Sequence, residues 1–151
     1  MNRHSRALGN DPAQASGQSV RGQRVYCSNR GQRGGCGRTF SLVLAEVLPR
    51  HTLTASLVWR WLVKVLAGLS LKAAAEKLRL PFALETVYRL RRGLARNLDV
   101  LRTRLAGRGE PPTVAHADPL FQTLAHLHVV FPRSACPPAE FQLHFQRPFL
   151  G

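Results

Sequence analysis

Residues 70–96 read SLKAAAEKLRLPFALETVYRLRRGLAR, and this stretch predicts two helices joined by a turn. The hydroxyl of Ser70 is placed to cap the first helix, which we expect to end near Arg79 because a proline follows two residues later. The second helix is expected to begin near Leu84 and to end near Gly107, since leucines recur along it at spacings of three or four residues.

A short alanine-rich helix, a turn and a second helix with a basic flank are typical of a helix-turn-helix unit, whose second helix enters the major groove of DNA. Glu85, Thr86 and Arg89 lie at the start of the second helix, where base edges would be contacted. Arg92 and Arg96 continue the basic side away from the leucines and are expected to hold phosphates. The turn is expected to be looser than usual, because an arginine stands where glycine is common. The competing interpretation is an amphipathic helix with a solvated basic face.

The leucine stripe of the second helix has two alternative uses. Packing against an earlier helix, expected over residues 53–66, requires the N-terminal half of the stripe. Leu98, Leu101 and Leu105 would then be spare, and their spacing would let them join a second copy in a short coiled coil. We therefore expect a three-helix bundle over residues 50–107, with a homodimer through these three leucines as the further use of the stripe.

The charge of the chain points to a polyanionic partner. Among 151 residues, 22 are Lys or Arg and eight are Asp or Glu, which gives a formal net charge of +14. Residues 1–40 carry seven arginines and one acid, residues 41–110 carry thirteen cations and five acids, and residues 111–151 carry two of each. Because the excess is confined to the first 110 residues, we expect that part to meet phosphate and the neutral remainder not to.

Two cysteines flank a glycine-rich connection between two strand-like runs. Cys27 ends the run from Arg24, and Cys36 precedes the run from Arg38, so the pattern predicts a β-hairpin with a C-x8-C spacing. That spacing is wider than the C-x2-C to C-x4-C of ordinary zinc sites, and two thiolates do not complete a tetrahedral site. The candidates for additional ligands are His4, His51 and Cys136.

The segment RGQRVYCSNR (residues 21–30), followed by GCGRTFS (residues 35–41) and the helix pair, resembles the zinc-ribbon plus helix-turn-helix leader region of bacterial insertion-sequence transposases and their accessory proteins. The resemblance spans roughly residues 20–105. It implies DNA binding, with Cys27 and Cys36 as half of a Zn site. In that family a Cys-x-x-Cys pair precedes the second pair, whereas this sequence has no cysteine before Cys27. We expect either that the first pair lies upstream of Met1 or that the metal has been lost.

The sequence divides into four parts, and the predicted fold class is mainly α. Residues 1–22 lack an apolar period and are expected to form a flexible basic arm. Residues 23–45 would form an incomplete zinc-ribbon-like hairpin, and residues 50–107 the helix-turn-helix DNA-binding domain. Residues 108–151 form a tail rich in proline and phenylalanine, expected to be irregular apart from a short helix over residues 118–130.

The expected function is DNA binding without catalysis. The eight acids are scattered, and no motif of a nucleotide-binding loop, a hydrolase nucleophile or a zinc protease is present. Three arginines of the hairpin are expected to contact DNA as well: Arg30, Arg33 and Arg38. No membrane span is expected, the cytoplasm close to the nucleoid is the expected location, and a separate transposase catalytic subunit is a candidate partner. The alternative is a non-specific RNA-binding protein or a degenerate fragment without its own function.

Overall fold

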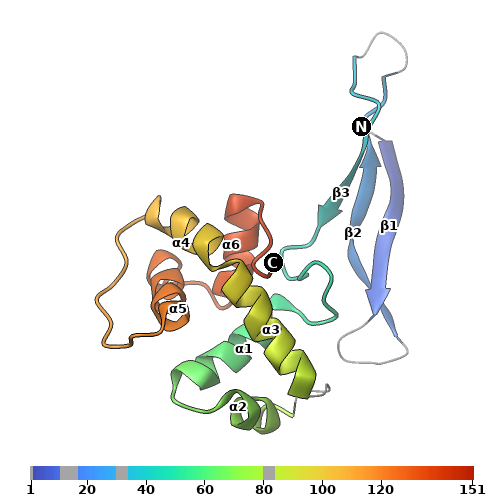
Figure 1. The fold of residues 1–151 in the computed structure, drawn as a ribbon. Coiled ribbons are helices and arrows are strands. Elements are labelled where there is room, and N and C mark those ends of the chain that lie inside the picture. The colour runs from blue at the N-terminus through green and yellow to red at the C-terminus, as the bar shows by residue number, and fades with distance from the viewer. Residues whose placement is uncertain (1, 11–16, 30–33, 80–83) are drawn as a thin grey trace. The chain divides into compact units, whose positions relative to one another are not determined.

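The computed structural model describes residues 2–10, 17–29, 34–79 and 84–151 (Figure 1). The chain forms two compact units, a sheet unit over Met1–Thr54 and a helical unit over Ala55–Gly151. The fold is mainly α with a small N-terminal β region, as the sequence predicts. None of the helices in the described ranges is both long and apolar enough to cross a lipid bilayer.

The sheet unit contains three antiparallel strands in the order β1-β2-β3. Their bounds are β1 Asn2–Asn10, β2 Gln18–Tyr26 and β3 Thr39–Val43. The expectation of a flexible arm over residues 1–22 is therefore wrong for β1 and the start of β2. The physical reason is that β1 pairs with β2 along its whole length through backbone hydrogen bonds, which need no apolar periodicity in the side chains.

The sheet unit has a few buried apolar side chains, in β2 and in the segment that follows β3. Val25, Leu48 and Leu53 are buried, and the guanidinium of Arg21 donates hydrogen bonds to the carbonyl oxygens of Leu48 and His51. These contacts tie β2 to the segment that follows β3.

The helical unit contains six helices (Figure 1). Their bounds are α1 Ala55–Leu66, α2 Leu71–Lys77, α3 Leu84–Arg96, α4 Leu98–Ala106, α5 Pro119–Val130 and α6 Pro137–Phe145. The first two helices and the helix over residues 118–130 lie where the sequence predicts them. The prediction of one long helix from Leu84 to Gly107 is wrong in one respect, because two helices, α3 and α4, meet at Asn97.

The interruption at Asn97 is stabilised by the end of the chain. The side-chain amide of Asn97 donates to the carbonyl oxygens of Pro148 at 2.8 Å and Phe149 at 3.1 Å. Phe149 and Leu150 are both buried. A polar side chain at the helix junction thus anchors the C-terminal segment, and that segment becomes part of the core.

The expectation of an irregular tail is wrong over α6. Pro137 and Pro138 occupy the first turn of this helix, where the missing N–H of proline would have no partner within the helix in any case. Phe141 is fully buried, and α6 packs against α1 and α5. Pro137 and Pro138 therefore mark the start of a helix rather than the absence of one.

Two of the three leucines expected to form a homodimer are covered within the chain. Leu101 and Leu105 have no exposed surface, and α4 packs against α5 of the same chain. Leu98 is half-buried. The tail thus covers Leu101 and Leu105, and a homodimer remains a prediction.

Candidate nucleic-acid interface

The position of α3 is fixed in part by its packing against α2. Ser70 caps α2 as predicted, its Oγ accepting from the backbone N–H of Ala73 at 3.1 Å. The indole N–H of Trp61 in α1 donates to the carbonyl of Leu71 at 3.2 Å, and α2 packs against both α1 and α3. These contacts brace α3 through a short helix, as in a helix-turn-helix arrangement.

The turn after α2 begins with a residue in the left-handed region. Arg79 has a φ of 49°, in the region that favours glycine. Its backbone N–H donates to the carbonyl of Glu76 at 2.9 Å, which closes the end of α2. Arg79 therefore adopts the glycine-like conformation that such a turn needs, at the position where the sequence departs from the usual residue. Residues 80–83, which complete the turn, lie outside the described residues.

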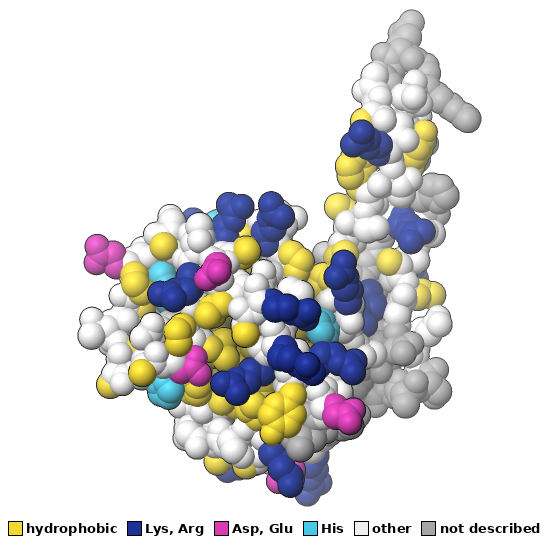
Figure 2. Space-filling view, viewed as in Figure 1, with side chains coloured by type: hydrophobic (Ala, Val, Ile, Leu, Met, Phe, Trp, Pro, Cys, Tyr) yellow, Lys and Arg dark blue, Asp and Glu magenta, His cyan; other side chains and the backbone are white. Residues whose placement is uncertain are grey.

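The two sides of α3 differ sharply in burial. Val87, Leu90 and Leu94 are buried against the rest of the helical unit. The opposite side carries the residues expected to contact DNA: Glu85, Arg89, Arg92 and Arg96 are exposed, and Thr86 is half-buried. Lys and Arg side chains gather over this part of the molecule in Figure 2.

The arginines of this side are available to a ligand. Arg89, Arg92, Ala95 and Arg96 line one open hollow on α3. Within the ranges that the structure covers, the ion pairs join Lys72 to Glu76 and Arg91 to Asp118, and neither involves these three arginines. Three neighbouring positive charges without a carboxylate partner raise the local positive potential and favour an anion. We call Arg89, Arg92 and Arg96 the arginine stripe.

Two further residues of α3 were not singled out from the sequence. Tyr88 is 48% exposed and lies one helical turn from both Glu85 and Arg92, a spacing that a helical wheel would have revealed. Arg91 lies 3.9 Å from Asp118, whose carboxylate also accepts from the N–H of Leu120 at the start of α5. Arg91 thus links α3 to α5. Helical spacing already places it away from the arginine stripe, and the tertiary structure adds its partner, Asp118.

The two cysteines of the sheet unit lie together where β2 ends and β3 begins. The N–H of Cys27 donates to the carbonyl of Arg38 at 2.9 Å, and the N–H of Gly37 donates to the carbonyl of Cys27 at 2.9 Å. The N–H of Cys36 donates to the Cys27 sulfur at 3.4 Å. Hydrogen bonds from the backbone amide and the thiol of Cys36 lower the pKa of the Cys27 thiol. The predicted hairpin and the proximity of its two cysteines are therefore present.

The other candidate ligands belong to other elements of the chain. Cys136 is buried at the start of α6, in the helical unit, and His51 is half-buried. The side chain of His4 lies outside the described residues, as do Arg30 and Arg33, whereas Arg38 is exposed. Within the residues that could be searched, no group of three or more His, Cys, Asp or Glu side chains surrounds a common point. Two sulfurs supply half of the four ligands that a structural zinc ion takes.

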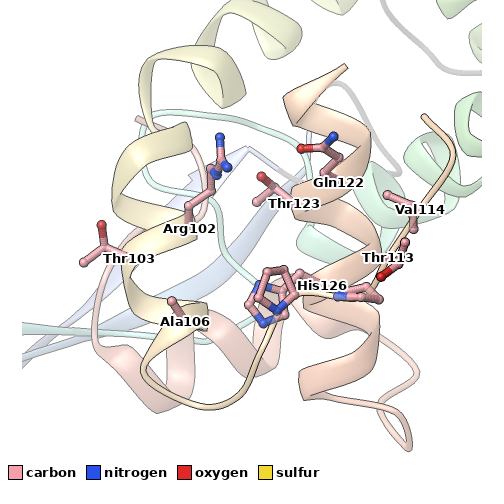
Figure 3. Close-up of a pocket in the computed structure, with 10 residues that line it drawn as sticks. Arg102, Thr103, Ala106, Thr113, Val114, Gln122, Thr123 and His126 are labelled. Atoms are coloured by element: carbon pink, nitrogen blue, oxygen red, sulfur yellow. The ribbon is translucent and has the colours of Figure 1, made fainter. Parts of the chain in front are cut away.

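A pocket of about 510 Å³ lies between α4 and α5 (Figure 3). Arg102, Gln122 and His126 bring polar groups to its wall. His126 is 4% exposed, and its Nε2 hydrogen-bonds the carbonyl of Gly109 at 3.0 Å, so this imidazole holds the α4–α5 connection. The hydroxyl of Thr123 donates to the carbonyl of Pro119 at 2.8 Å. The polar groups deepest in the pocket are thus engaged within the chain, which argues for a structural role.

Comparisons with known proteins give no relative from which a function could be transferred. No protein-family model, no curated protein and no solved structure matches this chain.

Proposed function

We propose that this chain is a non-enzymatic DNA-binding protein that reads duplex DNA with α3 in the major groove. The observation that carries the proposal is the arginine stripe, which is exposed, lacks a carboxylate partner among the described residues and lies on a helix braced by α2. The net charge of +14 supplies the sequence-independent attraction to phosphate that such a protein needs.

The positions of the exposed residues along α3 suggest that some contact bases and others contact phosphates. Glu85 and Thr86 in the first turn, with Arg89 one turn later, are placed to meet base edges. Arg89 would form the two-pronged contact that a guanidinium makes with guanine O6 and N7, and Glu85 would accept from the N4 amino group of cytosine. Arg92 and Arg96 would then hold phosphates, with Arg38 of the sheet unit, and Arg30 and Arg33 beside it in sequence, adding further phosphate contacts.

The transposase-like leader, the nucleoid location and the separate catalytic subunit belong to the same proposal. The resemblance over residues 20–105 supports them, together with the hairpin that brings Cys27 and Cys36 together ahead of the helix pair. Zinc in this chain remains a prediction that needs two ligands beyond these cysteines.

Binding measurements on two variants of α3 test the proposal. Arg92→Ala should weaken binding to every sequence alike and lower the slope of log affinity against log salt by about one, since one phosphate contact releases about one counterion. Arg89→Ala should cost about 1–3 kcal/mol at a selected duplex and much less at a scrambled one, because a forked base contact discriminates between sequences. Fluorescence anisotropy at two salt concentrations measures both effects.

Arg104→Ala is the matched control, because it removes one exposed positive charge from α4 and leaves α3 unchanged. It should alter neither the preference for the selected duplex nor the salt slope by as much as Arg92→Ala. If selection yields no preferred duplex, and if all three variants lower affinity equally, the assignment of α3 as a recognition helix is wrong. A non-specific interaction with any nucleic acid would then replace it.

A further inference from the structure

We propose that Cys27 and Cys36 together form a two-sulfur site for a thiophilic monovalent cation, Cu(I). The inference does not rest on DNA binding, because it uses only the hairpin of the sheet unit. It starts from the disagreement between the two sulfurs that the described residues bring together and the four ligands that zinc takes.

The backbone positions the two sulfurs before any metal arrives. Tyr26 pairs with Thr39 in the ladder between β2 and β3. Beyond that pair, Cys27 is joined to Arg38 and to Gly37 by two backbone hydrogen bonds of 2.9 Å each. The N–H of Cys36 donates to the Cys27 sulfur, 3.4 Å away. Among the described residues, the backbone hydrogen bonds beside both cysteines are therefore formed before metal binds.

Two glycines beside Cys36 make this turn sterically feasible. A Cβ at position 35 would lie 1.8 Å from the carbonyl oxygen of Ser28, so any other residue would force the two arms of the turn apart. Gly37 has a φ of 66°, which side chains rarely tolerate. The glycines on both sides of Cys36 are therefore required for the approach of the two cysteines.

The chemistry of the donors selects the cation. Thiolates prefer soft metals such as Cu(I), and Cu(I) is stable with only two sulfur ligands, whereas zinc ordinarily takes four. Cys36 is exposed and Cys27 half-buried, so an ion can reach both sulfurs from solvent. Binding converts two thiols and one Cu⁺ into a bis-thiolate complex of charge −1 with release of two protons, and the exposed guanidinium of Arg38 next to the turn favours that negative charge.

Titration of the full-length, reduced chain with Cu(I) under anaerobic conditions tests the site. A chromophoric Cu(I) chelator as competitor should report one tightly held Cu(I) per chain, and size-exclusion chromatography should give the same elution volume with and without the metal. Cys27→Ser and Cys36→Ser should each weaken binding at least 100-fold. Cys136→Ser, which removes the buried cysteine of the helical unit, should bind Cu(I) like the wild type.

Two further measurements distinguish a loss of Cu(I) binding from a loss of folding. Circular dichroism of each variant without metal should match the wild type, because serine replaces cysteine with little change in volume. The near-ultraviolet charge-transfer band from sulfur to copper should be present in the wild type and in Cys136→Ser, and absent from the two hairpin variants.

Three results would overturn the site. The first is retention of Cu(I) by Cys27→Ser or Cys36→Ser. The second is one Zn(II) held by two chains more tightly than Cu(I) is held by one, which would indicate a tetrahedral site shared between copies. The third is Cu(I) binding that accompanies the unfolding of the sheet unit. Since no DNA is present in the experiment, its outcome is separate from that of the duplex-binding test.

Discussion

The sheet unit and the helical unit of this protein are ordered by different interactions. In the helical unit many large apolar side chains are fully buried, Trp61, Phe141 and Phe149 among them. In the sheet unit every residue of β3 is exposed, and apolar side chains such as Leu8 and Leu42 remain more than half exposed. Backbone pairing therefore holds the strands, whereas apolar burial holds the helices.

This difference determines how each unit should respond to substitution. Removing a buried side chain leaves a cavity as well as losing the transfer free energy, so single changes in the helical unit should be costly. Replacing an exposed side chain on a strand leaves the backbone ladder intact, so most changes in the sheet unit should cost little. The predictions below follow that order.

The largest effect is expected in the tail of the helical unit. Phe141→Ala should lower the free energy of unfolding by about 3–5 kcal/mol, because Phe141 has no exposed surface and its ring packs 4.8 Å from that of Phe145, between centroids. Leu143→Ala on the same helix is the matched control, since Leu143 is 59% exposed, and should change that free energy by less than about 0.5 kcal/mol. Urea denaturation followed by circular dichroism measures both. Equal costs would mean that α6 does not belong to the core.

A smaller effect is expected where α3 meets α4. Asn97→Ala removes the donor of two hydrogen bonds, to Pro148 and Phe149, and should lower the free energy of unfolding by about 1–3 kcal/mol. The variant should also release the C-terminal segment to a carboxypeptidase sooner than the wild type. Thr103→Ala, at an exposed position of α4, serves as the control and should alter neither quantity. An Asn97→Ala variant as stable and as protected as Thr103→Ala would contradict the anchoring role.

The smallest effect is expected in the sheet unit, and it concerns reactivity rather than stability. Because hydrogen bonds from Cys36 lower the pKa of the Cys27 thiol, its thiolate forms at lower pH than that of an unperturbed cysteine. Alkylation of Cys27 by iodoacetamide, measured by mass spectrometry across a pH series, should therefore have a lower midpoint in the folded chain than in urea. Cys36→Ala should raise that midpoint only partly, since the backbone amide of residue 36 still donates. An identical midpoint with and without urea would show that the hydrogen bonds do not act on the thiol.

The features that the sequence predicts well are those with a local cause. A serine before an alanine-rich run caps α2 because its hydroxyl reaches the N–H three residues later. Leucine spacing identifies the buried side of α3 and, by exclusion, the arginine stripe. The C-x8-C hairpin is predicted for the same reason, since strand-like runs separated by glycines favour a turn.

The features that the sequence does not predict have a non-local cause. β1 has no apolar alternation, and its order arises from pairing with β2, which only the backbone geometry reveals. From the sequence, Pro137 and Pro138 predict irregular structure. In the fold they form the first turn of α6, because the helix buries Phe141 in the core of the helical unit. The ion pair between Arg91 and Asp118 joins residues distant along the chain, so helical spacing places Arg91 away from the stripe but does not identify its partner.

By itself, the sequence determined the charge of the chain, which needs only a count of residues. It also determined the Ser70 cap of α2 and the division of α3 into an apolar and a basic side, because both depend on residues within about one or a few helical turns of one another. Only the tertiary structure decided what covers the apolar stripe at Leu101 and Leu105. Periodicity specifies that a surface must be buried but carries no information on its partner, and here α5 of the same chain occupies the place that a second copy would have taken.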